Sequence, residues 1–223
     1  VVLTIALSMS MIPAQENKVS REDYHYLVEG VNRIDVDIEY ELGELIISAN
    51  PKGRGEIEVR SFGHDLDDED YDYDHDYDED DEQDKNRWSF NFNWRDIRDG
   101  EYQSTADSRL PQSLPTDIQI EFGLGEARID LSDLSISKFE MECGLGDTRI
   151  GMSTSNPVTC REASIEAGLG DLNVTDLGSL RTRELNLEIG LGASNVDLRG
   201  HITEDMDAGI SIGIGSVDMD VRN

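Results

Sequence analysis

Apolar and polar residues alternate along most of the second half of the chain, and each alternating run contains a leucine or isoleucine flanked by two glycines. Apolar residues stand one, three and usually five positions before the first glycine, and the alternation resumes four positions after it. A period of two is typical of a β-strand with one buried face. Each repeat therefore predicts a strand, a corner, a second strand and a return loop of variable length.

The corner tripeptide recurs at spacings of 21, 24, 22 and 23 residues. Its copies are Gly123-Leu124-Gly125, Gly144-Leu145-Gly146, Gly168-Leu169-Gly170, Gly190-Leu191-Gly192 and Gly213-Ile214-Gly215. Glycine suits such corners because it reaches backbone angles that a Cβ forbids. We predict that the central leucines and isoleucine point inward and stack into one core ladder, in which each buried leucine contributes ~1.5–3 kcal/mol.

A degenerate copy of the repeat lies nearer the start of the chain. Val36, Ile38 and Tyr40 alternate with polar residues, and Glu41-Leu42-Gly43-Glu44 stands where the glycine corner belongs. A single repeat cannot bury its apolar face, so repeats of this kind must stack to be stable. The sequence therefore predicts an all-β fold, a single-stranded parallel β-helix (solenoid) of about five to six rungs, with one long acidic and disordered insertion.

Composition divides the chain into four parts. Residues 1–14 are mostly apolar and end in a small residue, as the end of a secretory signal peptide does. We assign 15–62 to N-terminal strands and the first rung, and 114–223 to the repeat solenoid. The insertion is 63–113, with an acidic loop at 65–84 and an aromatic strand at 87–95. Residues 109–115 are expected to form a loop that leads into the repeats.

The formal net charge of −30 excludes a nucleic-acid-binding protein, because phosphate backbones are bound by clusters of lysine and arginine. The same charge disfavours binding to anionic lipid surfaces. No later apolar run reaches the ~18 residues that a membrane helix needs. We therefore expect a mature chain without a membrane span in an extracytoplasmic location: the periplasm, the cell surface or the medium.

The acidic loop holds 14 aspartates or glutamates in 20 residues, a density that favours disorder. Its candidate metal ligands have the odd-position spacing of a calcium loop, and they are Asp72, Asp74, Asp76 and Asp78. An EF-hand is excluded, because Tyr77 replaces the required glycine at position six and Gln83 replaces the glutamate at position twelve. We expect no cofactor other than weakly bound Ca²⁺.

Carboxylates follow three of the corners, at Glu126, Asp147 and Asp171, and would lie ~4.8 Å apart on adjacent rungs. Three interpretations stay open. Arg128 and Arg149, two residues later, would offset the repulsion. Alternatively the carboxylates accept backbone N–H bonds at the turn, or they form a metal ladder.

A second acidic row would lie on the outward face before the corners, at Glu121, Glu142, Glu166 and Glu188. Polysaccharide-active β-helix enzymes place paired acids on one solenoid face, but the array is short and this row looks like an ordinary solvated face. The glycine corner lacks the third glycine of a dinucleotide fingerprint, and no serine has a G-x-S-x-G setting. We expect no catalytic or cofactor-binding residues, and therefore no enzyme.

Cys143 and Cys160 are the two cysteines of the chain. In an oxidising compartment they would be able to pair. The alternative is two separate thiols, with Cys143 packed inside like a small apolar residue. The sequence does not decide between them.

The stretch LPTDIQIEFGLGEARIDLSDL, from Leu114 to Leu134, resembles the bacterial toast-rack domain family. Gly144-Leu145-Gly146-Asp147 and the aromatic strand beginning at Arg87-Trp88 match it as well. The resemblance covers about 31–223 and implies a β-solenoid associated with the bacterial cell envelope. Related folds occur in LiaF-like envelope-stress proteins and in adhesin head domains. The family has no established catalytic residues, and this chain lacks the transmembrane segments of the LiaF-like pattern.

These observations predict an exported cell-envelope β-solenoid that acts as a non-catalytic binding, scaffold or adhesin-like module. Its partner would be an envelope protein or a glycan, because solenoids present long faces suited to recognition. The last rung would also be able to pair edge to edge with a second copy, giving a homodimer. The alternatives are an envelope-stress accessory protein, a cation-binding protein acting through the acidic loop, and the polysaccharide-active enzyme.

Overall fold

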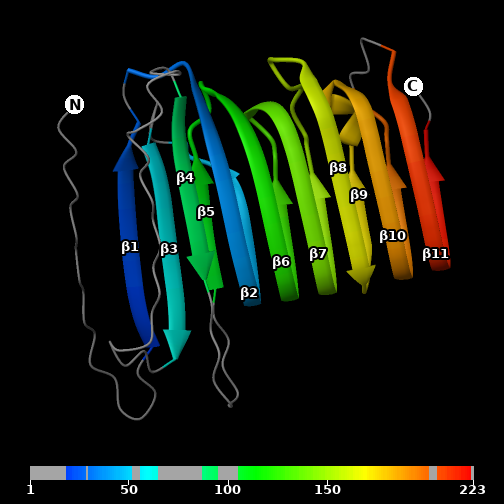
Figure 1. Ribbon diagram of the computed structural model, residues 1–223, viewed down its shortest axis with the longest axis horizontal. Coiled ribbons are helices and arrows are strands. Elements are labelled where there is room, and N and C mark those ends of the chain that lie inside the picture. Colours follow the sequence, from blue (N-terminus) through cyan, green and yellow to red (C-terminus); the bar gives the residue numbers. More distant parts are fainter. Residues whose placement is uncertain are drawn as a thin grey trace.

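The computed structural model describes residues 19–28, 30–51, 56–64, 87–94, 105–200 and 205–221. These residues form one eleven-stranded sheet and a single 3-10 turn. The elements are β1 (Val19–Leu27), β2 (Arg33–Ala49), β3 (Glu56–His64), β4 (Arg87–Trp94), β5 (Thr105–Leu110), β6 (Pro115–Asp130), β7 (Ser135–Gly151), β8 (Cys160–Leu169), β9 (Leu172–Thr175), η1 (Leu177–Leu180), β10 (Thr182–Asp197) and β11 (Asp207–Asp220). The strands stand side by side in a row from β1 to β11 (Figure 1).

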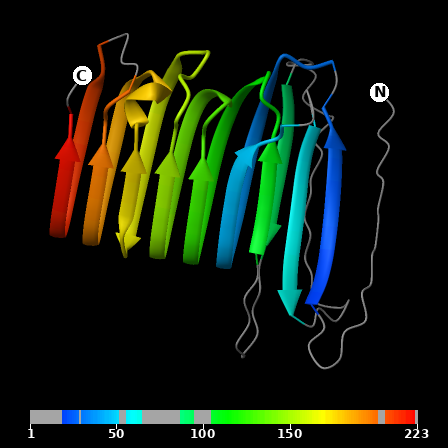
Figure 2. The same ribbon diagram turned by 180° about the vertical axis from the view of Figure 1, so that it is seen from behind.

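The second half of the row is the predicted solenoid. Strands β2, β6, β7, β10 and β11 each run through a corner, so that one strand contributes a limb to each of two facing layers (Figures 1 and 2). β8 and β9 together supply the equivalent pair of limbs. Every neighbouring pair in this series is parallel. The prediction of an all-β parallel solenoid is therefore confirmed.

The core lies between the two layers and is filled by the alternating apolar residues. In β6 the residues one, three and five positions before the corner, Phe122, Ile120 and Ile118, are at most 3% exposed. Neighbouring rungs stack side chains of the same position on one another. The rings of Tyr40 and Phe122, for example, are stacked with centroids 6.0 Å apart and planes 8° from parallel. This burial of alternate residues is what the period of two predicted.

The glycines of the corners are required by close backbone packing as well as by conformation. The second glycine of each corner has a positive φ, between +131° and +159° in Gly125, Gly146, Gly170, Gly192 and Gly215. A Cβ on Gly170 would lie 1.9 Å from the carbonyl oxygen of Gly146. The first glycine has no such φ, but a Cβ on Gly168 would lie 2.5 Å from the carbonyl oxygen of Gly144. Both columns of glycine therefore set the contact between rungs.

The residues between the glycines stack as predicted, but their predicted inward orientation is wrong. Leu42, Leu124, Leu145, Leu169, Leu191 and Ile214 pair in register along the corner edge. Leu124, Leu145, Leu169 and Leu191 are 44–46% exposed and Ile214 is 75% exposed, so none belongs to the core.

The physical reason is a shift in the alternation at the corner. The last buried residue before it, Phe122, and the first after it, Ala127, are an odd number of positions apart. The two limbs therefore follow different parities. The alternation of the first limb, extended to Leu124, points it inward, whereas that of the second limb points it outward. The leucine stands at the apex of the turn, where the backbone itself closes the interior and the side chain projects to solvent.

The opposite end of the row is built differently. β4 pairs in parallel with the first half of β2 and β5 with its second half, so two separate strands cover the two limbs of β2. β3 then pairs antiparallel with β5, and β1 pairs antiparallel with β3. β4 lies where the aromatic alternation predicts a strand. The predicted loop at 109–115 is wrong at both ends, because Arg109 and Leu110 end β5 and Pro115 begins β6.

The return loops lie at the edge opposite the corners and contain a polar element of the core. Asn156 is 1% exposed and joins three successive loops. Its side chain accepts a hydrogen bond from the Ile136 N–H at 2.9 Å, and donates to the Ile136 and Leu180 carbonyl oxygens at 2.7 and 2.9 Å. A buried amide satisfied in this way fixes the loops relative to one another.

Two predicted segments lie outside the described residues. They are the signal segment 1–14 and the acidic loop 65–84, which includes the candidate calcium ligands Asp72, Asp74, Asp76 and Asp78.

Candidate functional site

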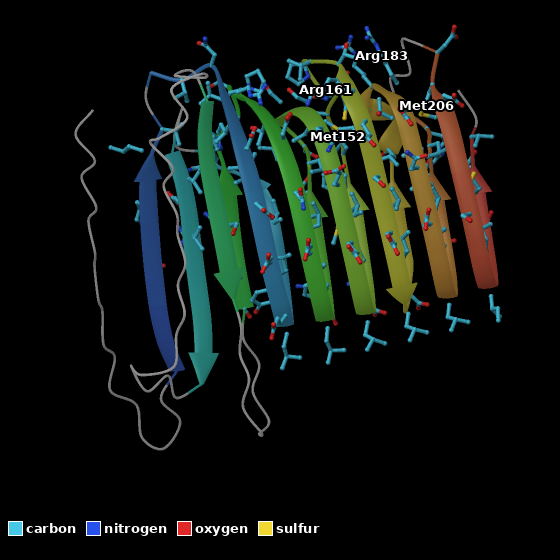
Figure 3. The ribbon with its side chains drawn as sticks, in the orientation of Figure 1. Met152, Arg161, Arg183 and Met206 are labelled. Atoms are coloured by element: carbon cyan, nitrogen blue, oxygen red, sulfur yellow. The ribbon has the colours of Figure 1, made fainter. Side chains whose placement is uncertain are left out.

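An exposed apolar row follows the corner edge of the solenoid. We name it the leucine ridge and define it as Leu124, Leu145, Leu169, Leu191 and Ile214. The corresponding edge of the ribbon carries a regular row of side chains that project beyond the strands (Figure 3). The four leucines are 44–46% exposed, and Ile214, which has a neighbour on one side only among the described residues, is 75% exposed. Contiguous exposed apolar surface on a folded protein usually marks a site of interaction.

An acidic column runs beside the ridge on the outward face before the corners. We name Glu121, Glu142, Glu166 and Glu188 the glutamate column; they pair in register on successive strands. None of the four carboxylates forms an ion pair with another described residue. Together with Gln119, Glu140 and Ser164, the first three line a shallow depression of about 170 Å³. The column is thus an uncompensated row of negative charge, as the sequence predicts for an outward face.

The carboxylates after the corners are partly compensated. The Arg128 guanidinium contacts Glu44 and, at 2.8 Å, Glu126. Arg149 lies 3.5 Å from Glu126. The predicted offset by these two arginines is therefore confirmed at Glu126.

The second interpretation of these acids holds at the third corner. Asp171 accepts a hydrogen bond from the Ala193 N–H of the next rung at 3.2 Å. For the third interpretation, a metal ladder, the geometry gives no support. Over the described residues, no three His, Cys, Asp or Glu side chains gather in a group that could hold a metal ion.

The two cysteines are separate buried thiols in the structure. Cys143 pairs with Ala167 of β8, and Cys160 lies seven residues before Ala167 in that strand, so the thiols are roughly 23 Å apart along the strand. A disulfide requires Cα atoms within about 7 Å. Burial raises the pKa of both thiols to about 11, which makes them poor nucleophiles at neutral pH.

The described cation nearest to the glutamate column in β7 is Lys138, which forms an ion pair with Glu140 at 2.6 Å and not with the column itself. Arg161 and Arg183 are adjacent in the register of β8 and β10, near the return-loop edge (Figure 3). Arg161 forms an ion pair with Asp117 at 2.8 Å. Met152 and Met206 lie near the same edge (Figure 3). The return-loop edge is therefore of mixed charge, whereas the leucine ridge has an unpaired acidic column beside it.

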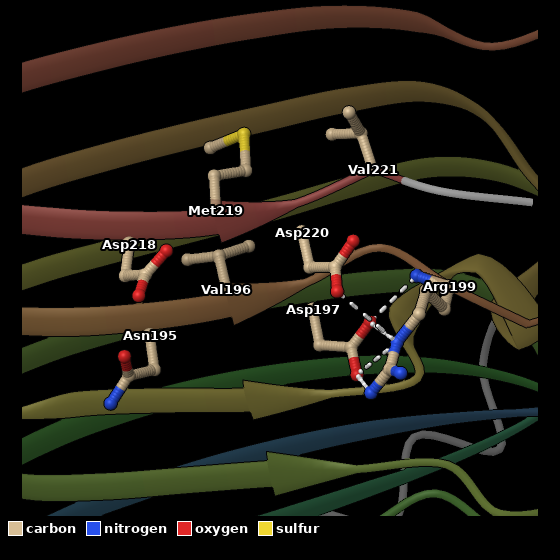
Figure 4. A pocket seen from close by; sticks show the side chains of 8 residues that line it. All are labelled: Asn195, Val196, Asp197, Arg199, Asp218, Met219, Asp220 and Val221. Atoms are coloured by element: carbon tan, nitrogen blue, oxygen red, sulfur yellow. Dashed lines mark hydrogen bonds and ion pairs between the residues drawn. The ribbon is translucent and has the colours of Figure 1, made fainter.

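A hollow of about 600 Å³ lies at the β11 end of the solenoid (Figure 4). Met219 and Val221 contribute apolar surface to it. Arg199 lies beside it, with its Nε 2.8 Å from Oδ1 of Asp197 and 3.7 Å from Oδ2 of Asp220. The Arg199 guanidinium holds the pKa of the Asp197 carboxyl below its ordinary value. This ion pair joins the last two strands and neutralises part of the charge around the hollow.

Sequence reasoning missed the exposed ridge, the Asn156 bridge and the Arg199 ion pair. The ridge had a signal, since the odd separation of Phe122 and Ala127 already indicates a change of parity at the corner. The other two depend on how return loops fold, and the sequence carries no periodic signal there.

The part of the chain that the structure describes contains no helix with the length and apolar character needed to cross a membrane.

Comparison with known proteins agrees with this geometry. A crystal structure described as a "putative cell adhesion protein" from Clostridium sporogenes ATCC 15579 superposes with a TM-score of 0.64 at 16% identity, covering 91% of this chain and 99% of that chain. At this identity the likeness concerns the fold. A "putative adhesin" from Bacteroides fragilis NCTC 9343 aligns at 15% identity over 93% of this chain and 89% of that chain, with a TM-score of 0.32.

A comparison with curated proteins finds no match. The family model described as the N-terminal domain of toast_rack matches residues 15–175, which is well over half of the chain. The resemblance found in the glycine corners and the aromatic strand is thereby confirmed, and the protein belongs to the toast-rack family.

Proposed function

We propose that this protein is an exported, adhesin-like binding module of the cell envelope, and that the leucine ridge with its acidic flank contacts a basic, amphipathic segment of a partner protein. The observation that carries the proposal is the ridge itself. Folded proteins seldom keep a continuous apolar row at a surface that nothing covers, and a row of this kind is a frequent feature of interaction sites.

The dimensions of the ridge suit an amphipathic helix. Its five side chains stand ~4.8 Å apart, so the ridge is about 19 Å long. A helix rises 1.5 Å per residue, and about 13 residues would span that length. The helical pitch of ~5.4 Å is close to the rung spacing, so apolar residues at successive turns would meet successive leucines.

The electrostatics favour a basic partner. The glutamate column lies on one side of the ridge without ion pairs to other described residues, and Asp147 lies on the other side. The whole chain carries a net charge of −30, which attracts cations from a distance and speeds association with a basic segment. Lysine or arginine side chains beside the apolar stripe of the partner would reach the glutamate column on one side and Asp147 on the other.

The location and the absence of catalysis are parts of the same proposal. The apolar segment 1–14 supports export, and the adhesion-related descriptions of the structural relative from Clostridium sporogenes support an adhesin-like role. General acid–base catalysis requires carboxyl groups held by oriented partners. The glutamate column lies instead on an open face, which supports a binding surface over a catalytic one.

The test uses a synthetic, fluorescently labelled 14-residue peptide of leucine and lysine in amphipathic order. We expect saturable binding to the wild-type chain, and a loss of at least tenfold in affinity for the Leu145→Glu/Leu169→Glu double variant. Leu27→Glu is the matched control, because Leu27 is 51% exposed and lies in β1 at the other end of the sheet. It should bind the peptide as the wild type does.

A variant lacking residues 65–84 separates ridge binding from general attraction to the acidic loop. The deletion variant should bind the peptide less tightly than the wild type. Adding the two ridge substitutions to it should lower its affinity by the same factor as in the full chain. Equal binding by the wild type and the double ridge variant would contradict the proposal. Binding to envelope glycans that is unchanged by the ridge substitutions would contradict it as well.

A further inference from the structure

The outer side of β11 has the side chains of a core strand, and none of the described strands lies beyond it. Ile210 and Ile212 occupy the positions of Leu187 and Ile189 in β10, which are at most 5% exposed. In β11 they are 39% and 51% exposed, because no described residue lies beyond them. Among the described residues, β11 therefore presents an open cross-section of the solenoid core.

The backbone of β11 also pairs with none of the described strands on that side. The Asp220 carbonyl accepts a hydrogen bond from the Leu198 N–H, so the backbone groups of Asp220 point to β10. Backbone direction alternates along a strand, and those of Met219 and Val217 therefore point outward. Open edges of this kind are normally protected by charge, proline or a bulge.

β11 carries no such protection over most of its length. Residues 208–217 contain no charged residue and no proline. The glutamate column ends at Glu188, and Ser211 stands in its register on β11. The edge strand at the other end, β1, carries Arg21, Glu22 and Asp23 within nine residues. In a chain of net charge −30, the β11 end is the surface on which a second copy meets the least repulsion.

We propose that two copies of this chain associate end to end through β11, with a two-fold axis parallel to the limbs. This symmetry places the limb before the corner, 207–213, antiparallel to the limb after the corner, 215–221, of the other copy. The core of one solenoid then continues into the core of the next. The contact is isologous and closes at two copies, and it leaves the charged β1 edges at the outer ends.

One register of the two β11 strands both buries the inward apolar side chains and keeps the aspartates away from one another. When Ile212 lies opposite Val217 of the second copy, Ile210 lies opposite Met219 and Ala208 opposite Val221. All of these occupy inward positions, and the apolar wall of the 600 Å³ hollow is then covered.

The same register places the aspartates opposite neutral residues. Asp218 then faces Ser211 of the second copy, and Asp220 faces Gly209. If like limbs paired instead, with Val217 opposite Met219 or Val221 of the second copy, Asp218 would face Asp218 or Asp220 of that copy. Like charges directly opposite one another are destabilising, which favours the register of unlike limbs.

The size of the surface predicts a reversible dimer. Each limb is about 23 Å long, and two layers packed ~10 Å apart are about 20 Å thick overall, so the end face covers about 460 Å² per copy. Interfaces of this size lie at the small, transient end of the range. We expect dissociation in the micromolar range and tighter association at higher salt, because screening weakens the repulsion between two acidic chains.

Sedimentation equilibrium on the 223-residue chain tests the proposal. Wild type should approach twice the mass of 24.9 kDa as its concentration rises. Ile212→Glu should weaken the association at least tenfold. Leu191→Glu is the matched control, because Leu191 is 44% exposed and lies one strand from the edge; it should associate like the wild type. A wild type that stays monomeric, or an Ile212→Glu variant that dimerises normally, overturns the proposal.

Cross-linking tests the register. Ile212→Cys mixed with Val217→Cys should form a covalent dimer under mild oxidation, and neither variant alone should do so. The native thiols do not interfere, because both are buried. Cross-linking of Ile212→Cys with itself would overturn the register of unlike limbs. This inference is independent of the proposed ridge function, since peptide binding weakens with salt and dimerisation strengthens.

Discussion

Gly146 lies directly against the carbonyl oxygen of Gly125, so closely that a Cβ on Gly146 would be 1.9 Å from that atom. Gly146 also has a φ of +131°. The two constraints act together, because the conformation that turns the corner is the one that brings successive rungs into contact. Neither a change of rotamer nor a small rotation of one residue relieves such a contact, since both atoms belong to the backbone.

Gly146→Ala is therefore expected to destabilise the protein by about 3 kcal/mol or more, from steric displacement added to backbone strain. Gly30→Ala separates the two causes. Gly30 also has a positive φ, of +77°, but a Cβ there would have no atom within 4 Å. It should cost about 1–2 kcal/mol, the conformational part alone. Urea unfolding of the two variants measures the difference, and equal losses would contradict the packing argument.

Leu169 and Leu187 provide a direct comparison between ridge and core. Leu187 is 1% exposed and Leu169 is 45% exposed. We expect Leu187→Ala to lower the free energy of unfolding by about 2–5 kcal/mol, and Leu169→Ala by about 1 kcal/mol or less. Thermal and denaturant unfolding of the two variants checks this. A large loss at Leu169 would mean that the ridge is part of the structural core.

Asn156→Ala removes three hydrogen bonds and leaves the Ile136 N–H and the Ile136 and Leu180 carbonyls without their partner. Each buried group left unpaired costs about 1–3 kcal/mol, so we expect a loss of about 3 kcal/mol or more. Asn173→Ala is the control, since Asn173 is exposed, and should change stability by about 0.5 kcal/mol or less. Protection of the Ile136 amide from hydrogen exchange should fall only in the first variant.

The buried thiols predict a specific dependence on pH. Their pKa in the folded protein is about 11, above the ordinary value of 9.0. Because the folded pKa is raised, the thiols contribute stability that is complete below about pH 9 and is lost as the pH rises toward 11. Wild type should therefore lose more stability between pH 8 and pH 10.5 than a Cys143→Ala/Cys160→Ala variant, as measured by urea unfolding at both pH values.

Thiol labelling at pH 8 provides a second readout for the cysteines. Only about one thiol in a thousand is ionised at that pH when the pKa is about 11. The native protein should therefore react very slowly, and both thiols should react once urea unfolds the chain without reductant. Failure to react after unfolding would indicate a disulfide and contradict the structure.

Asp37 is the acidic residue whose substitution should stabilise the chain. Burial, followed by repulsion from Glu39, raises the pKa of its carboxyl above the ordinary value of 3.8. The protonated form contributes stability that is lost as the pH rises through the folded pKa, so the ionised form is unfavourable at pH 7. Asp37→Asn should raise the melting temperature at pH 7, and the gain should vanish near pH 3. Asp218→Asn, at an exposed position, should show no such pH-dependent gain.

The fold was predictable because two independent patterns agree in this sequence. Alternation identified the inward residues, as at Phe122 and Ile120, and the recurring glycine corners identified where each strand turns. The orientation of Leu124 was mispredicted because the alternation was extended across a corner at which it changes parity. Periodic patterns describe regular backbone and lose their meaning at the residue where the backbone turns.

The N-terminal end was harder to predict for a different reason. β5 turns Ala106, Ser108 and Leu110 inward, and only one of the three is large and apolar. A strand with so weak an alternation is not distinguished from a loop by its sequence. Its identity as a strand comes from pairing with β2 and β3, which are distant in the chain.

The candidate surfaces depend still more on tertiary structure. The sequence identified Glu142 and Glu166 as outward residues, but it did not show that neither has a cationic partner among the described residues. The exposure of Ile212 follows only from the position of β11 at the end of the row. Composition and residue spacing predict which side chains of a rung point inward. They do not predict whether another rung covers those side chains.

The return loops have a consequence for how such a chain can change length. Corners are locked to one another by backbone contact, so an added residue there would break the contact between rungs. The repeat spacing nevertheless varies from 21 to 24 residues, and the return loops between the strands absorb that variation. The corner edge therefore has a fixed length in every repeat, whereas the return-loop edge tolerates inserted residues. Foreign peptides grafted at 153–155 would leave the corner edge, and every surface built on it, in place.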